Sequence, residues 1–305
     1  MERIDPLARS FARGRSTLFP AVLLLLVVLA MPVQVVAQAS PPRQTIRIMF
    51  VGSSYTFVNN LGDVVAGIAA SDPEGPIVEP TLAPYAGGSS LQTHLDNGNT
   101  RKLLSSQKWD FVVLQETSLY GGTDAVGDKP PQIGKPPTAY FTAVKTWVPL
   151  IQAAGGKTVL EMTWGRRLPR PDGPSPMAKD VADAVYSISK ETGAMVAPVG
   201  LAFEEARRRL VTLELHTYDG SHPSPAGTYL AALVIYATVT GRSPMGAPAL
   251  IYGRTFTSVP AATYGGTIDW RVVEKGTRVP LVDLREATAA ELQRVAWDVV
   301  SKQRK

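Results

Sequence analysis

Short runs of β-branched and apolar residues alternate with longer stretches of helical periodicity from residue 45 onward. The runs that predict strands cover residues 45–51, 76–86, 110–115, 157–163 and 194–199. Apolar side chains recur at three- and four-residue spacing over residues 61–71, 138–154, 177–191, 201–211, 224–241 and 287–302, which predicts helices. Strands joined by crossover helices form parallel sheets. The sequence therefore predicts a three-layer α/β/α sandwich around a mostly parallel five-stranded sheet.

The N-terminal segment, residues 1–39, differs from the rest of the chain. Four arginines precede an apolar run, residues 18–31, that is too short to span a bilayer comfortably. Ala37-Gln38-Ala39 then fits the small-x-small pattern of a secretory cleavage site. We expect a signal peptide over residues 1–39 and one mature domain, residues 40–305, that ends in a helix, has no membrane span and is secreted or periplasmic. An uncleaved membrane anchor is the alternative.

Cysteine content and charge exclude several classes of protein. The chain has no cysteine, which rules out disulfides, thiolate metal sites and a cysteine nucleophile. The net charge is +5, and removing the four arginines and two acidic residues of segment 1–39 leaves +3. This mild basicity is not that of a nucleic-acid-binding protein, so no nucleic-acid partner is expected.

Small and polar residues follow the predicted strands, where the ligands of open parallel sheets bind. Gly52, Ser53 and Ser54 follow the first strand, and Asp219 and His222 precede the apolar helix over residues 224–241. Serine, histidine and aspartate are the residue types that serve as nucleophile, base and orienting acid in acyl transfer. Each signal alone also has a structural explanation, because a serine after a strand is commonly a helix N-cap.

Four segments carry a family resemblance. "IMFVGSSYTFVNNL", "YAGGSSLQTHL", "DFVVLQETS" and "DGSHPSPAGTYLAALVIYATVTG" resemble the four ordered blocks of the SGNH, or GDSL-like, hydrolase superfamily, over about residues 46–241. The match is closest to the secreted branch, in which the first block reads Gly-x-Ser-Tyr/Phe-Thr. The resemblance implies a flavodoxin-like sandwich and an esterase mechanism that needs neither a metal nor another cofactor.

The resemblance also implies roles for individual residues. Ser54 would be the nucleophile, His222 the base and Asp219 the acid that orients it. The oxyanion hole would combine the amides of Ser54 and Gly88 with the side chain of Gln115. Gly87 is an alternative to Gly88.

The chain departs from the family pattern in two blocks. Many members have Asp or Asn where this chain has Ser53, so either Ser53 or Ser54 is a candidate nucleophile. The third block usually reads Gly-x-Asn-Asp, whereas this chain has Gln-Glu-Thr-Ser over residues 115–118. The amide of Gln115 could replace that of the asparagine as a donor.

Aromatic and basic residues near the strand ends are candidates for substrate binding. We expect Tyr55 and Trp164 to shape the substrate site, with Trp164 stacked on a sugar ring. An arginine among Arg166, Arg167 and Arg170 would hold an anionic group. The alternative is a solvated loop that contains a partly buried tryptophan.

Two further histidines have less specific readings. We expect His94 to form hydrogen bonds within a helix. His216 could join Asp219 and His222 in a metal site, although a third convincing ligand is missing. A metal-dependent hydrolase therefore remains an alternative to the metal-free reading.

Together these features predict a secreted serine esterase that removes a small acyl group, acetyl first among them, from a carbohydrate or cell-wall polymer. The partner would be a small-molecule or polysaccharide ester. A non-catalytic glycan-binding protein on the same scaffold is the alternative. Two long polar loops, residues 116–137 and 164–176, have the length typical of functional loops.

Overall fold

The computed structural model describes residues 42–84, 88–116, 138–167, 176–254 and 278–303. Residues 42–305 form one compact unit. The predicted signal peptide, Gly87, Arg170 and nearly all of the loop over residues 116–137 lie outside the described residues. None of the helices in the described ranges combines the length and the apolar character needed to cross a bilayer.

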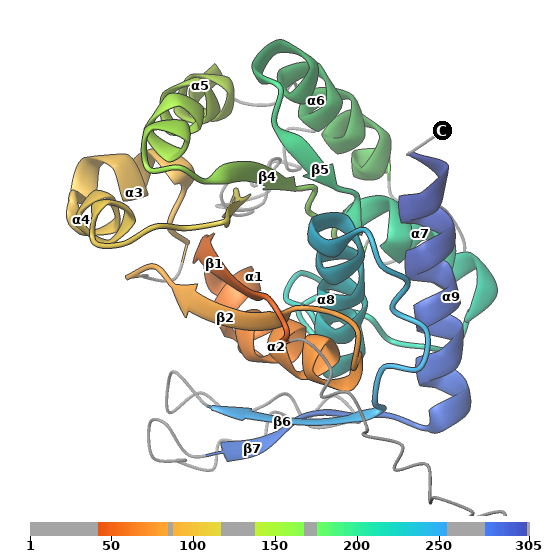
Figure 1. Cartoon of the computed structure of the whole chain (residues 1–305). Coiled ribbons are helices and arrows are strands. Elements are labelled where there is room, and N and C mark those ends of the chain that lie inside the picture. The colour runs from red at the N-terminus through yellow and green to blue at the C-terminus, as the bar shows by residue number, and fades with distance from the viewer. Residues whose placement is uncertain (1–41, 85–87, 117–137, 168–175, 255–277, 304–305) are drawn as a thin grey trace, which may run out of the picture. The chain divides into compact units, whose positions relative to one another are not determined.

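A five-stranded parallel sheet is the centre of the fold (Figure 1). Its strands are β1 (Thr45–Val51), β2 (Ile77–Leu82), β3 (Phe111–Gln115), β4 (Lys157–Glu161) and β5 (Met195–Ala197). The order is β2-β1-β3-β4-β5, and every neighbouring pair is parallel. This is the flavodoxin-like order, whose switch point lies between β1 and β3. The predicted α/β class is confirmed, and the carboxyl ends of β1 and β3 lie side by side.

Two apolar cores cover the two faces of the sheet, because alternate strand residues point to opposite faces. In β1, Ile48 and Phe50 belong to one core, while Met49 and Val51 belong to the other. The helices of the first core are α2 (Leu61–Ser71), α7 (Val199–Arg209), α8 (Pro225–Thr240) and α9 (Glu286–Lys302). Those of the second core are α3 (Leu91–Asn97), α4 (Asn99–Ser105), α5 (Thr138–Ala153) and α6 (Pro176–Thr192).

Helix α8 lies deepest in the first core. All of its residues from Ala226 to Thr238 are buried, and it packs against α2, α7 and α9. A helix that is apolar on every side has no solvent-facing stripe, which explains its near-continuous run of Ala, Leu, Val and Ile. The loop that carries Asp219 and His222 leads directly into this helix.

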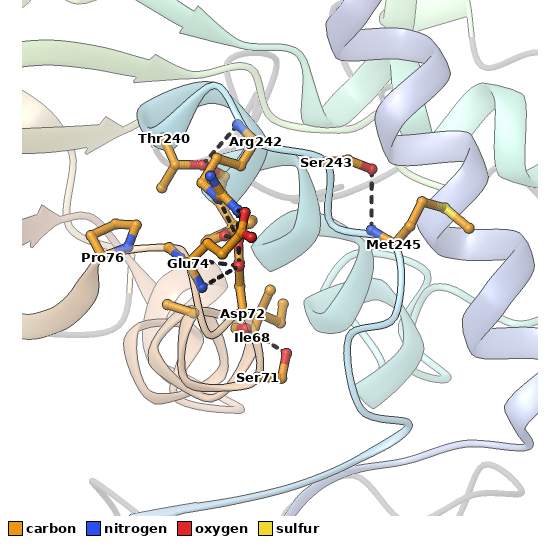
Figure 2. Close-up of polar contacts among 12 residues, drawn as sticks. Ile68, Ser71, Asp72, Glu74, Pro76, Thr240, Arg242, Ser243 and Met245 are labelled. Carbon is orange, nitrogen blue, oxygen red and sulfur yellow. Dashed lines mark hydrogen bonds and ion pairs between the residues drawn. The ribbon is translucent and has the colours of Figure 1, made fainter. Parts of the chain in front are cut away.

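A polar cluster joins the C-terminal ends of α2 and α8 (Figure 2). Asp72, which follows α2, accepts hydrogen bonds from Arg242 Nε at 2.5 Å and Nη2 at 3.0 Å. The Tyr236 hydroxyl donates to the same carboxylate at 2.6 Å. The Arg242 hydrogen bonds outweigh desolvation and hold the pKa of Asp72 well below its usual range. The cluster therefore fixes α2 against α8.

A two-stranded antiparallel sheet, β6 (Leu250–Arg254) and β7 (Arg278–Asp283), was not predicted. It is attached to α2, because Arg254 Nη2 lies 2.8 Å from Asp63 Oδ1 and the Arg254 amide lies 2.8 Å from Asp63 Oδ2. Each strand has only five or six residues and includes charged side chains. The alternation of apolar and polar residues is therefore too short to predict a strand from the sequence.

Candidate active site

The turn after β1 brings a serine to the start of a helix. Gly52 follows the strand, Ser53 is the N-cap, and Ser54 is the first residue of the short helix α1 (Ser54–Phe57). A Cβ at Gly52 would lie 2.3 Å from Thr56 Oγ1 and 2.7 Å from Gln115 Oε1, so only glycine fits there. As the first residue of α1, Ser54 has a backbone N–H with no acceptor inside the helix.

Gln115, at the end of β3, fixes this turn. Its Oε1 accepts hydrogen bonds from the Ser53 amide at 2.8 Å, the Ser53 hydroxyl at 3.0 Å and the Thr56 hydroxyl at 3.1 Å. Its Nε2 donates to the backbone carbonyl of Glu116. This geometry does not support the predicted oxyanion role, because the carbonyl end of the Gln115 amide faces the turn and the amino end has a backbone partner.

The imidazole of His222 lies against Ser54. Nε2 is 2.8 Å from Ser54 Oγ, and Nδ1 is hydrogen bonded to Asp219 Oδ2. A carboxylate can only accept, so Nδ1 carries the proton and Nε2 is free to accept one from the Ser54 hydroxyl. The structure thus joins the three predicted residues in one chain of hydrogen bonds.

The second carboxylate oxygen of Asp219 organises its own loop. Oδ1 accepts hydrogen bonds from the Ser221 amide at 2.8 Å, the His222 amide at 3.0 Å and the Thr217 hydroxyl at 2.7 Å. Burial alone would raise the pKa of Asp219, but these bonds and the one from the imidazole lower it to about 2. The Asp219 carboxylate is therefore ionised at neutral pH.

The loop is closed by backbone contacts as well. The Thr217 amide donates to the His222 carbonyl at 2.8 Å, and the Ser224 amide donates to the Leu215 carbonyl at 2.9 Å. Gly220, at the tip, has φ +66°, a left-handed conformation that favours glycine. These contacts hold His222 just ahead of α8.

The two candidate nucleophiles have different environments. Ser53 is fully buried, and its hydroxyl donates to Gln115. Ser54 is half-buried, and its hydroxyl lies at the His222 imidazole. The geometry favours Ser54 for proton transfer to the histidine.

Trp164 is not placed to stack on a sugar ring, contrary to the prediction, whereas Tyr55, which was predicted to shape the substrate site, lies next to His222. Trp164 is only 3% exposed, because one face stacks on Tyr55 at 4.8 Å between centroids and the other on Phe203 at 4.4 Å. Its Nε1 donates to the Ser221 carbonyl at 2.9 Å. Tyr55 is 5% exposed and meets the His222 ring edge-on at 5.6 Å. Both rings form a buried wall behind the histidine loop.

His94 supports the turn from the other side. Its Nε2 donates to the Gly52 carbonyl at 2.9 Å, and its Nδ1 accepts from the Thr100 hydroxyl at 2.9 Å. Burial lowers the pKa of His94, which favours this neutral form. The prediction that His94 forms hydrogen bonds within a helix is wrong, because its ring partners are Gly52 and Thr100, which lie outside its own helix α3. Sequence reasoning missed the contact with Gly52, since nothing local links residues 42 positions apart.

His216 and Gly88 complete the set of predicted residues. His216 Nε2 is hydrogen bonded to the Gly165 carbonyl at 3.0 Å, and burial lowers its pKa to about 4. In the described ranges, no three His, Cys, Asp or Glu residues are grouped so that they could hold a metal ion. Gly88 has φ +72° in the turn that precedes α3, so its conformation requires glycine.

Comparison with known proteins identifies the family. One similar solved structure is that of a protein from Slackia heliotrinireducens whose description assigns it provisionally to the SGNH hydrolases. The two chains share 30% identity, and the alignment covers 64% of this chain and 99% of the Slackia protein, with a TM-score of 0.51. At that identity over nearly the whole of the relative, the chain belongs to the SGNH hydrolase family.

Two further structures share the fold at lower identity. A DUF4886 family protein from Bacteroides uniformis has 15% identity and a TM-score of 0.56, over 86% of this chain and 97% of that one. A catalytic mutant of an acetylxylan esterase from Geobacillus stearothermophilus has 15% identity and a TM-score of 0.50, over 66% and 96%. No protein-family model and no curated protein matches the sequence.

Proposed function

We propose that this protein is a secreted or periplasmic serine esterase that hydrolyses small acyl esters, with acetyl as the expected acyl group. The observation that carries the proposal is the 2.8 Å contact between Ser54 Oγ and His222 Nε2, with Nδ1 of the same ring held by Asp219. A nucleophile, a base and an orienting acid at hydrogen-bond distance are the requirements of acyl transfer through a serine.

In the proposed acylation step, Ser54 Oγ attacks the ester carbonyl carbon while its proton passes to His222 Nε2. The resulting imidazolium is stabilised by Asp219, which remains ionised. Collapse of the tetrahedral intermediate breaks the bond to the alcohol oxygen, which takes the proton from Nε2. Water then attacks the carbonyl carbon of the acyl-Ser54 ester while His222 Nε2 takes its proton. The bond to Ser54 Oγ breaks, Oγ takes the proton back from Nε2, and the acid is released.

The oxyanion of the intermediate needs backbone donors. We assign this role to the amide of Ser54, which has no acceptor within α1, and to the amide of Gly88. Gln115 acts differently in this proposal: it positions the turn through Ser53 and Thr56.

The substrate assignment to an acylated carbohydrate or cell-wall polymer rests on two considerations. The N-terminal 39 residues have the pattern of a secretory signal, which would bring the enzyme to such polymers. The structure from Geobacillus stearothermophilus, which shares the fold, is described as an acetylxylan esterase.

The test compares Ser54→Ala with Ser53→Ala on 4-nitrophenyl acetate and on a fluorophosphonate probe that labels activated serines. Ser54→Ala should abolish hydrolysis and labelling, whereas Ser53→Ala should keep the labelling. Labelling of the wild type that persists in Ser54→Ala would refute the assignment. No hydrolysis and no labelling of a folded wild type would favour the glycan-binding alternative.

A further inference from the structure

Two side-chain contacts flank the hydrogen bond between the candidate nucleophile and base. On one side, the hydroxyls of Tyr55 and Ser221 lie 2.5 Å apart. On the other side, Asn59 Nδ2 donates to the Pro223 carbonyl at 3.0 Å. Ser221 and Pro223 are the two neighbours of His222 in the chain. The segment that follows β1 therefore holds the histidine from both sides.

The side-chain amide of Asn59 uses both of its hydrogens for such long-range contacts. Nδ2 donates to the Pro223 carbonyl at 3.0 Å and to Thr228 Oγ1 at 2.9 Å. These partners are 164 and 169 positions away, and Thr228 lies in the first turn of α8. One amide group therefore joins the segment after β1 to the histidine and to the start of α8.

The other end of this side chain has no partner among the described residues. Asn59 is 1% exposed, and its buried Oδ1 has no hydrogen-bond donor there. A buried acceptor without a donor lowers stability, and an apolar side chain of similar shape would avoid that loss. What an asparagine contributes at this position is therefore its pair of donors.

The backbone that carries Asn59 is fixed in a tight turn between two helices. Val58 is the C-cap of α1, and Asn60 is the N-cap of α2 with φ +45°. The Asn60 amide donates to the Phe57 carbonyl at 3.0 Å, and its side chain donates to the Arg254 carbonyl at 2.7 Å. The short helix α1 thus sets the position of Asn59 relative to the nucleophile turn.

The Pro223 carbonyl lies at the end of the loop that carries the candidate base. Proline has no backbone N–H, so this carbonyl is the only backbone hydrogen-bonding group of the residue. Building on the proposed esterase function, we propose that Asn59 is a positioning residue. By holding the Pro223 carbonyl, it keeps the His222 imidazole at hydrogen-bond distance from Ser54. A misplacement of about 1 Å in an active site can cost about 100-fold in rate.

The test removes the donors of Asn59 while nearly keeping its shape. In Asn59→Leu we expect kcat per folded protein on 4-nitrophenyl acetate to fall about 10- to 100-fold, with KM within about twofold of the wild type. The rate of labelling by the fluorophosphonate probe should fall by a similar factor, since labelling also requires proton transfer to the histidine. Urea unfolding reports whether the variant is folded.

The matched control is Thr228→Val, which removes the other acceptor of the Asn59 amide but leaves the contact with Pro223. It should lose stability, because one buried hydrogen of the amide becomes unpaired, and keep kcat within about twofold. Equal losses of kcat in the two variants would indicate a structural role for Asn59 and overturn the inference. A folded Asn59→Leu with the kcat of the wild type, or with a change in KM alone, would overturn it too.

A second variant, Asn59→Ser, decides the question if Asn59→Leu does not fold. Its shorter side chain cannot reach the Pro223 carbonyl, so the same selective loss of kcat is expected. Failure of both variants to fold would show that the residue is structural and would overturn the inference. Normal variants of an active wild type would overturn this inference alone, whereas a wild type without hydrolysis that depends on Ser54 would overturn the esterase proposal as well.

Discussion

His222 Nε2 lies 2.8 Å from Ser54 Oγ, although the two residues are 168 positions apart in the chain. The contact depends on two elements of the first core. Ser54 begins the helix after β1, and His222 is held by a closed loop just before α8. Because core packing fixes both the turn of Ser54 and the loop of His222, the two side chains are held at hydrogen-bond distance before any substrate binds.

Replacing Asp219 with asparagine should lower kcat strongly. The asparagine amide can present a donor to Nδ1 and so stabilise the wrong tautomer of His222, a change that costs about 10⁴-fold in a serine protease triad. Steady-state kinetics on 4-nitrophenyl acetate measure the effect. The matched control is Thr217→Val, which removes one hydrogen bond to the same carboxylate and should cost far less. Comparable losses in both variants would contradict an orienting role for Asp219.

Gly52→Ala should destabilise the protein and displace the turn that carries Ser54. The added Cβ would meet Thr56 Oγ1 at 2.3 Å and Gln115 Oε1 at 2.7 Å, and such overpacking typically costs about 1–3 kcal/mol. Urea unfolding gives the free energy, and kcat reports the displacement. Gly193→Ala, at a site with no atom within 4 Å of the new Cβ, should lose stability through its backbone strain but retain kcat. An active, fully stable Gly52→Ala would show that the turn is not tightly packed.

Trp164→Phe should lower stability and kcat without a large rise in KM. The substitution removes the hydrogen bond to the Ser221 carbonyl and part of the stack between Tyr55 and Phe203, and core changes of this kind cost about 0.5–3 kcal/mol. Thermal unfolding and the separate kinetic constants test this. Tyr252→Phe, at a side chain that is 51% exposed, is the control. A large rise in KM at unchanged stability would instead support direct contact with substrate.

Glu161, at the end of β4, should make stability depend on pH. Both of its carboxyl oxygens are buried without a hydrogen-bond partner among the described residues, and desolvation raises its pKa to about 8. The folded state therefore keeps a proton that the unfolded chain loses above the ordinary glutamate pKa. Stability should fall as pH rises toward about 8, by at most about 1.4 kcal/mol per pH unit, and level off beyond.

The measurement for Glu161 is urea unfolding between pH 5 and pH 9. Glu161→Gln cannot ionise, so its stability relative to the wild type should increase over that range. The exposed Glu79, whose side chain is 56% accessible, gives the control variant Glu79→Gln, with no such trend. A Glu161→Gln difference that stays constant with pH would show that the carboxyl group ionises in the folded protein.

The sequence was sufficient to predict the parallel sheet and its sandwich, because buried strands and amphipathic helices alternate with clear periods. It also indicated Ser54, Asp219 and His222 as a set, since each lies next to a strand or helix end where parallel sheets gather their ligands. The contact between them could not be deduced from spacing, because it depends on how β1 and α8 meet in the folded core.

The orientations of individual side chains were beyond the sequence. Gln115 presents its side-chain carbonyl to the turn, and Trp164 has both ring faces covered. The sequence alone is equally compatible with a Gln115 amide turned the other way and with an exposed Trp164 ring. The fixed direction of Gln115 comes from three donors on Ser53 and Thr56. The burial of Trp164 comes from Phe203, 39 positions later in the chain. Such long-range packing leaves no local pattern.

The complete burial of α8 from Ala226 to Thr238 has a consequence for motion near His222. A helix enclosed on every side cannot slide or rotate unless the neighbouring helices separate, and separation would amount to global unfolding. Amide hydrogens in this helix should therefore exchange with solvent among the slowest in the protein. Motion of the histidine loop cannot extend past Ser224, the N-cap of α8. The His222 imidazole can therefore move only with the short loop segment that precedes this fixed helix.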